Sequence, residues 1–224
     1  MSDDILSALY PFSDEGKMTP AVSDADLQAS IEQKVTESVE AKQQFFTSQR
    51  DAFVAAARMM AQVYENQGQM FTMGNGGSNC DASHLALEFL HPVTAGRPAL
   101  PALNLGCDVT TVTATSNDLG FDNAFVRQLI AYGREGDLLV GFSTSGHSAN
   151  LMRAFEKAKA LGLHTLGFAG MDGGEMARSD AVDICLIAPT NSVHRIQECH
   201  LTAYHILWDL VHTLLANARE RKVK

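Results

Sequence analysis

Basic residues, cysteine pairs and long apolar runs are all scarce in this 224-residue sequence. Lys and Arg number 17 against 26 Asp and Glu, which gives a formal net charge of −9. Because duplex nucleic acid and anionic membranes both reward clustered positive charge, the composition argues against either as a partner. The 4 cysteines form no Cys-x-x-Cys pair, and no apolar run approaches a membrane span. With Asp3 and Asp4 in place of a basic leader, we expect a cytoplasmic protein without disulfides.

Hydrophobic residues make up 46% of the chain, enough for a substantial core. We predict a flexible extension at residues 1–23 and a single domain at residues 24–224. Residues 24–67 show a helical pattern that breaks once near residues 47–48. Such a long helix must bury its apolar face, so we expect part of it to meet another subunit; a solvent-facing charged coil is the alternative. The apolar stripe consists of Leu27, Ile31, Val35, Val39, Phe45, Phe46, Phe53, Met59, Met60 and Val63.

Beyond residue 67, short apolar runs alternate with amphipathic stretches, without hairpin signals. This alternation predicts an α/β fold with a parallel sheet that carries helices on both faces. Residues 109–115 fit either a strand or a short helix, and the pattern leaves both open. Leu90, Ile130 and Leu201 are expected on the buried faces of their helices. Strands are expected at 70–73, 102–105, 137–142, 164–169 and 182–188, and helices at 79–90, 121–132, 149–161, shortly after Gly174, and at 191–218.

A glycine-rich turn joins the first expected strand to the helix at 79–90. Its three glycines permit positive φ and close backbone approach, and they are Gly74, Gly76 and Gly77. A helix N-terminus in such a turn is an anion-binding arrangement, to which Ser78 adds a hydroxyl. Farther along, His84 and Glu88 lie four residues apart on one helix face, either as an ordinary surface pair or as part of a functional site.

A second turn, after the strand at 137–142, holds four hydroxyls within six residues. The helix at 149–161 follows directly, so hydroxyls and free N–H groups converge as a phosphate site without added positive charge requires. A plain helix cap formed by Ser148 alone is the alternative, but four hydroxyls exceed what a cap needs. We therefore favour phosphate, and the four residues are Ser143, Thr144, Ser145 and Ser148.

The start of the last expected helix supplies a third motif, Arg195-Ile196-Gln197-Glu198 followed by His205. The earlier motifs are Gly74-Asn75-Gly76-Gly77-Ser78 with Asp81 and His84-x-x-x-Glu88, and then Ser143-Thr144-Ser145-Gly146-x-Ser148. Taken in this order, the three resemble the sugar isomerase (SIS) domain family, and its phosphoheptose isomerases in particular. The similarity covers roughly residues 24–215, and three ordered motifs are far more specific than one.

The resemblance implies a flavodoxin-like five-stranded parallel sheet in a tetrameric, cytoplasmic ketose–aldose isomerase. Its members interconvert sedoheptulose 7-phosphate and D-glycero-D-manno-heptose 7-phosphate through an enediol, which needs a base within reach of two carbons and a group that polarises the carbonyl. By this resemblance Glu88 and His205 would be the acid/base pair, and a zinc ion in each subunit would be held by His84, Glu88, Gln197 and His205. Ser143, Thr144, Ser145 and Ser148 would hold the phosphate, and the remaining substrate contacts would be Asn75, Gly76, Ser78, Asp108, Asn117, Asp118 and Gln197.

Three departures from the family pattern concern the sugar. The segment Phe89-Leu90-His91-Pro92 replaces the usual Gly-Arg and so removes a cationic contact, for which Arg97 is the candidate replacement. His147 stands where Asn is usual, and His194 where an acidic residue or Thr is common. Two alternatives therefore stay open, which are an isomerase of another ketose phosphate and a non-catalytic SIS module that binds a sugar phosphate or a protein. His205 favours the enzyme, although a histidine satisfied within a packed helix is its plainer interpretation.

The spacing of Gln197 and His205 bears on assembly. Eight residues correspond to about 12 Å along a straight helix, too far for both to reach one zinc ion at bond lengths near about 2.1 Å. Either Gln197 precedes the regular helix, or the two ligands come from different chains. In both cases we expect a homo-oligomer with its active site at a subunit interface.

Overall fold

A computed structural model describes residues 22–223, with the side chains of residues 22–217; residues 1–21 of the predicted extension lie outside this part. The chain divides into two units between Thr36 and Glu37. The sheet and all the helices after α2 belong to the second unit, and the domain boundaries expected from the sequence stay a prediction. The helices are α2 (Asp24–Ser48), α3 (Arg50–Glu65), α4 (Gly77–Leu90), α5 (Val109–Leu119), the 3-10 turn η2 (Phe121–Asn123), α6 (Val126–Tyr132), α7 (Ala149–Ala160) and α8 (Val193–Val223). The strands are β1 (Met70–Gly74), β2 (Ala102–Asn104), β3 (Leu138–Phe142), β4 (His164–Gly170) and β5 (Ile184–Ala188).

Side-chain hydrogen bonds fix the start of α2 and the junction between α2 and α3. At its start the Ser23 hydroxyl accepts from the Asp26 N–H at 3.2 Å, and the Asp26 carboxylate accepts from the Ser23 N–H at 3.1 Å, a reciprocal capping box. The predicted break near residues 47–48 is confirmed, because α3 begins anew after Gln49. The Gln49 amide donates to the Ile187 carbonyl at 2.6 Å and accepts from the Ile187 N–H at 2.9 Å, so it pairs with the edge strand β5.

The five strands form one parallel sheet in the order β2-β1-β3-β4-β5. From β1 the chain crosses through α4 to β2 at one edge, and then returns through α5 and α6 to β3 on the other side of β1. The strand order therefore reverses between β1 and β3. In open parallel sheets such a reversal leaves a crevice at the carboxyl ends of the two strands, where ligands bind.

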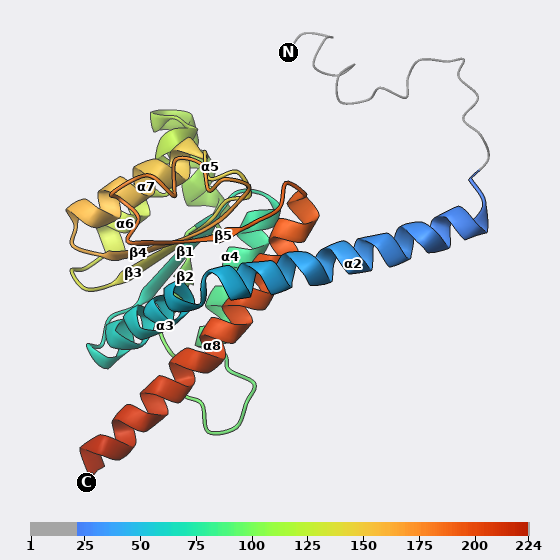
Figure 1. The fold of residues 1–224 in the computed structure, drawn as a ribbon. Coiled ribbons are helices and arrows are strands. Elements are labelled where there is room, and N and C mark those ends of the chain that lie inside the picture. Colours follow the sequence, from blue (N-terminus) through green and yellow to red (C-terminus); the bar gives the residue numbers. More distant parts are fainter. Residues whose placement is uncertain (1–21, 224) are drawn as a thin grey trace. The chain divides into compact units, whose positions relative to one another are not determined.

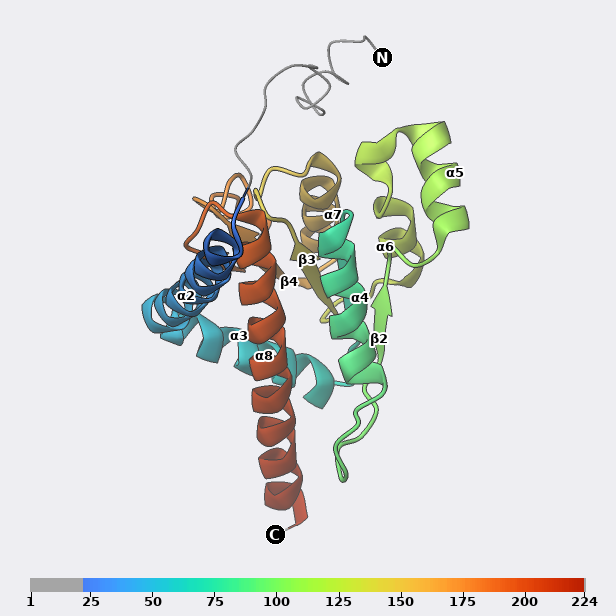
Figure 2. The same cartoon turned by 90° about the vertical axis from the view of Figure 1, so that its right-hand side faces the viewer.

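Side chains alternate between the two faces of the sheet. Met70, Leu138 and Val140 face a core that is completed by α3, α4 and α8. Phe71 and Leu139 face the opposite core, which α6 and α7 cover. Figures 1 and 2 show these two groups of helices on opposite sides of the strands. The α/β class with helices on both faces, predicted from the alternation of elements, is confirmed.

The segment at 109–115, which fitted either a strand or a helix, is helical and belongs to α5. Asp108 decides this, because its carboxylate accepts from the Thr111 N–H at 3.1 Å and so caps the helix. The single helix expected at 121–132 is wrong, since η2 and α6 are separate and the bend between them carries Phe125 into the core. The short helix expected after Gly174 is also wrong: residues 171–183 form turns, with Gly173 and Gly174 at positive φ.

Three leucine or isoleucine side chains expected to be buried are exposed, and they are Leu90, Ile130 and Leu201. Each directly follows a fully buried residue, for example Leu129 before Ile130. Successive residues of a helix point about 100° apart, so only one of each pair can face the core.

The thiols of Cys80, Cys107, Cys185 and Cys199 are free. None of the helices in the described part of the chain combines the length and the apolar character that crossing a bilayer takes.

Candidate active site

Two loops meet where the strand order reverses. One follows β1 and leads into α4, and the other follows β3 and leads into α7. Asn75 in the first loop and Asn150 in the first turn of α7 exchange two amide hydrogen bonds, each 2.9 Å long. Because these bonds join side chains 75 positions apart, they hold the two loops together at the carboxyl ends of β1 and β3.

The loop after β3 is organised by its own hydroxyls. Ser143 is buried, and its oxygen accepts from the Gly146 N–H at 3.0 Å and lies 3.1 Å from the Ser148 hydroxyl. Ser145 accepts from the N–H of His147 at 3.3 Å. Ser148 is the residue before α7, but its side chain makes no capping bond with the described helix. The plain helix cap left open by the sequence is therefore not what this loop forms.

Gly146 is required for the compact shape of this loop. Its φ is +68°, and a Cβ atom there would lie 2.1 Å from the carbonyl oxygen of Gly173. The turn after β4 therefore packs directly against the loop after β3. Thr144, which is half-buried, completes a set of four hydroxyls at the start of α7, an arrangement that suits a bound phosphate.

The first loop leaves open space at the start of α4. Gly76 has a φ of +53°, and a Cβ atom there would have no described heavy atom within 4 Å. Ser78 lies in the first turn of α4 and is buried. The predicted helix start at residue 79 is two residues late, because α4 begins at Gly77.

His84, Glu88 and His205 come together between α4 and α8. Their candidate ligand atoms all lie within 4.8 Å of one another. The Nε2 atom of His84 is 3.1 Å from the Glu88 carboxylate, and the rings of His84 and His205 are 5.1 Å apart between centroids. Sequence spacing predicted the His84 and Glu88 pair and the family resemblance named His205 with them; the structure brings His205 to the pair from 117 positions beyond Glu88.

Two aromatic residues of α8 make hydrogen-bond contacts with His84 and Glu88 of α4. The hydroxyl of Tyr204 lies 2.8 Å from Nδ1 of His84, and the indole N–H of Trp208 donates to the backbone carbonyl of Glu88 at 2.8 Å. Both pairs join residues 120 positions apart, so α4 and α8 run side by side in one register (Figure 2). Neither aromatic was predicted, because each belongs to the site only through this pairing of helices.

Burial shifts the pKa of three residues at this site, which are His205, Tyr204 and Asp81. Partial burial lowers the pKa of His205, and the neighbouring His84 lowers it further, while Glu88 opposes the change. The neutral imidazole is thereby favoured, which is the form that accepts a proton or binds a metal. Burial, together with the charges of Asp81 and Glu88, raises the pKa of Tyr204. Burial also raises the pKa of Asp81 to about 7.

Gln197 lies apart from this cluster within the described chain. A Cβ atom on Gly77 would be 2.4 Å from its amide nitrogen, so the side chain rests on the first turn of α4. Gly77 precedes His84 by seven residues, about 10 Å along the helix axis. Helix α8 begins at Val193, so the idea that Gln197 precedes the regular helix is wrong. The other explanation, ligands from different chains, stays a prediction.

The three residues predicted as further substrate contacts after β2 belong to α5 and its N-cap. Asp108 is the N-cap of this helix, and its hydrogen bonds from Thr111 lower the pKa of its carboxyl. Asn117 donates to the Asp118 carboxylate at 2.9 Å in the last turn of α5. All three are exposed, and the structure does not join them to the cluster of His84, Glu88 and His205.

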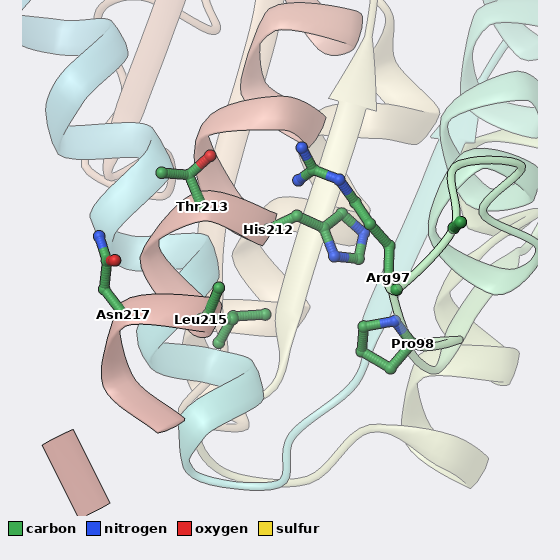
Figure 3. A pocket seen from close by; sticks show the side chains of 9 residues that line it. Arg97, Pro98, His212, Thr213, Leu215 and Asn217 are labelled. Atoms are coloured by element: carbon green, nitrogen blue, oxygen red, sulfur yellow. The ribbon is translucent and has the colours of Figure 1, made fainter. Parts of the chain in front are cut away.

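Arg97, the candidate for the missing cationic contact, is held by two residues of α8. Its guanidinium stacks over Trp208 at 4.8 Å from the ring centroid and pairs with Asp209 at 2.6 Å. Figure 3 shows Arg97 and Pro98 facing α8 across a pocket of about 280 Å³. Arg97 therefore holds the loop after α4 against α8 through Trp208 and Asp209. Trp208 in turn donates to the backbone carbonyl of Glu88.

Comparisons with known proteins agree on one family. The sequence model described as SIS domain matches residues 34–170. Over 171 residues the chain is 45% identical to a phosphoheptose isomerase of Chlorobaculum parvum, covering 75% of this chain and 81% of that protein. The structure of phosphoheptose isomerase GmhA from Neisseria gonorrhoeae matches with a TM-score of 0.77 and 37% identity, covering 84% of this chain and 99% of that one. The phosphoheptose isomerase from Francisella tularensis matches with a TM-score of 0.79 and 32% identity, covering 83% of this chain and 98% of that one.

Proposed function

This chain belongs to the SIS domain family, and from that membership we propose that it is an aldose–ketose isomerase acting on sedoheptulose 7-phosphate. The product is D-glycero-D-manno-heptose 7-phosphate. The relatives that support this substrate are phosphoheptose isomerases at up to 45% identity over most of their length. One observation carries the proposal for the site: an imidazole, a carboxylate and a second imidazole meet within 4.8 Å, between helices α4 and α8.

Each part of the reaction has a suitable side chain. Glu88 removes a proton from the hydroxymethyl carbon of the ketose and returns it to the former carbonyl carbon, with an enediol between the two steps. The proton of the terminal hydroxyl moves to the former carbonyl oxygen, and we assign this transfer to His205. The lowered pKa of His205 supports this role, because a neutral imidazole can both accept and donate a proton.

The phosphate end of the substrate is assigned to the loop after β3. Ser143, Thr144, Ser145 and Ser148 offer hydroxyls at the N-terminus of α7, and the helix dipole favours an anion there. Asn75, Gly76 and Ser78 of the neighbouring loop are assigned to the sugar. The amide pair that joins the two loops supports a single site that spans both.

The donor set fits a zinc ion. Two imidazoles and one carboxylate are the protein ligands of many catalytic zinc sites. We propose that His84, Glu88 and His205 hold the ion, and that Gln197 of a neighbouring copy is the fourth ligand. When bound, zinc would supply polarisation of the substrate carbonyl.

We further propose a homo-oligomer, a tetramer by the family resemblance. The apolar stripe of α2 supports this: Leu27, Ile31, Val35 and Val39 recur every four residues and are 49% to 64% exposed. A second copy of the same stripe is its natural cover, since identical apolar faces can pair about a two-fold axis. The four free thiols support the cytoplasmic location expected from the sequence.

The test of the function is isotope exchange with a variant of the base. Turnover of sedoheptulose 7-phosphate in deuterated water should place deuterium on the carbon beside the carbonyl. Glu88→Gln should reduce turnover by at least about a hundredfold, the range for removal of a general base, while retaining sugar-phosphate binding. The same substitution at the exposed Glu156 of α7 serves as the control. Bound zinc is quantified in each variant, because loss of metal would imitate loss of the base.

The opposite result would favour the non-catalytic module. If the zinc-loaded protein binds the sugar phosphate yet exchanges no proton with any ketose phosphate offered, the isomerase fails. Exchange with another ketose phosphate but not with sedoheptulose 7-phosphate would keep the chemistry and change the substrate.

A further inference from the structure

We propose that Tyr204 is a positioning residue, whose hydroxyl fixes the orientation and the tautomer of His84 for metal binding. This inference rests on the proposed metal centre. It concerns a residue that is no ligand itself and that enters the site only through the pairing of α4 with α8.

The contact is short and rigidly held. The Tyr204 hydroxyl lies 2.8 Å from Nδ1 of His84, and only 1% of the Tyr204 residue is exposed. Its ring is packed edge-on by Phe142 at 6.0 Å and by His205 at 4.8 Å between centroids. The phenol therefore has one direction in which to point, and that direction is Nδ1 of His84.

This contact identifies the metal-binding atom. Because Tyr204 occupies Nδ1, the ring nitrogen turned toward Glu88 is Nε2, at 3.1 Å from the carboxylate. A carboxylate only accepts hydrogen bonds, so without metal the neutral imidazole carries its proton on Nε2 and accepts from Tyr204 at Nδ1. A metal bound to Nε2 excludes that proton, which then resides on Nδ1 and is donated to the Tyr204 oxygen.

A hydroxyl suits this reversal because it can both donate and accept. Once Tyr204 accepts from His84, its own proton needs an acceptor. Asp81 lies one turn before His84 on α4, its charge acts on Tyr204, and its Oδ2 has no hydrogen-bond partner among the described residues. We therefore assign Asp81 as the acceptor of the Tyr204 proton in the metal-bound state.

The test is the zinc affinity of Tyr204→Phe, measured by competition with a chromophoric chelator at about pH 8. Phe keeps the ring packing and removes only the hydroxyl. We expect the affinity to fall by about tenfold or more, the usual effect of losing the hydrogen-bond partner of a metal-binding histidine. The matched control is Tyr64→Phe in α3, which removes a buried hydroxyl that donates to the Pro101 carbonyl at 3.4 Å. Its affinity should stay within about twofold of wild type.

The outcomes separate this inference from the metal centre itself. Equal zinc affinity of folded Tyr204→Phe and wild type overturns the role of Tyr204 and leaves the metal centre standing. A wild-type protein that binds no zinc overturns both. Imidazole nitrogen-15 shifts of the wild type supply a measurement that needs no variant: the His84 proton should move from Nε2 to Nδ1 when zinc is added, and an unchanged tautomer overturns the inference.

Discussion

The buried carboxyl of Asp81 should make the free energy of unfolding depend on pH in the direction opposite to that of most buried carboxylates. It is 9% exposed, and its Oδ2 has no hydrogen-bond partner among the described residues. Burial without a compensating donor raises the pKa of this carboxyl from 3.8 to about 7. The folded protein therefore prefers Asp81 protonated, and we expect Asp81→Asn to be more stable than wild type at neutral and alkaline pH.

The sign and the size follow from proton linkage. Between about pH 4 and about pH 7 the folded state binds more protons at Asp81 than the unfolded chain, so the free energy of unfolding falls as pH rises through this window. Moving the pKa from 3.8 to about 7 costs at most about 4 kcal/mol, fully present above about pH 7. An amide has no such proton to lose, so we expect the variant to gain at least about 1 kcal/mol at about pH 8.

The assay compares urea unfolding at about pH 5 and about pH 8, with chelator present and the protein concentration fixed. Asp137→Asn is the matched control, because Asp137 is 3% exposed but accepts from the N–H groups of Gln69 and Arg134, each at 2.9 Å. There the same substitution should destabilise by about 1 to 3 kcal/mol. The reasoning on Asp81 is refuted if its variant is no more stable than wild type at about pH 8, or if the variant keeps the full pH dependence.

Two further predictions concern the phosphate loop and the assembly. Ser145→Asp puts a carboxylate at the proposed phosphate position and should abolish sugar-phosphate binding, measured by calorimetry, with unchanged thermal unfolding; unaltered affinity would disprove the assignment. Val35→Asp puts a charge into the exposed stripe of α2 and should weaken self-association at least about a hundredfold by sedimentation, since an unpaired buried charge costs several kcal/mol. Activity should fall in parallel, and a fully active monomer would exclude an active site shared between subunits.

Much of the fold was predictable from local signals. The apolar run at 137–142 and the small-residue turn after it gave β3 and the start of α7, because a buried strand and a helix start each have a local pattern. The assignments that stayed open or were wrong were local as well. Residues 109–115 suited a strand or a helix, and the cap bond of Asp108 to Thr111 decided between them. At 121–132 burial of Phe125 bent a chain that periodicity alone treats as one helix.

The sequence by itself determined the candidate side chains of the site, since the glycine turn, the hydroxyl turn and the pair His84 and Glu88 each lie within a few residues. Only the tertiary structure decided that α8 packs against α4, the helix that carries His84 and Glu88. The register of α4 against α8 brings Tyr204 to His84 and leaves Gln197 two turns away. The same packing places Trp208 of α8 against the guanidinium of Arg97, which lies in the loop after α4. Contacts between residues more than a hundred positions apart leave no periodic trace in either helix, because they depend on how both helices pack on one face of the sheet.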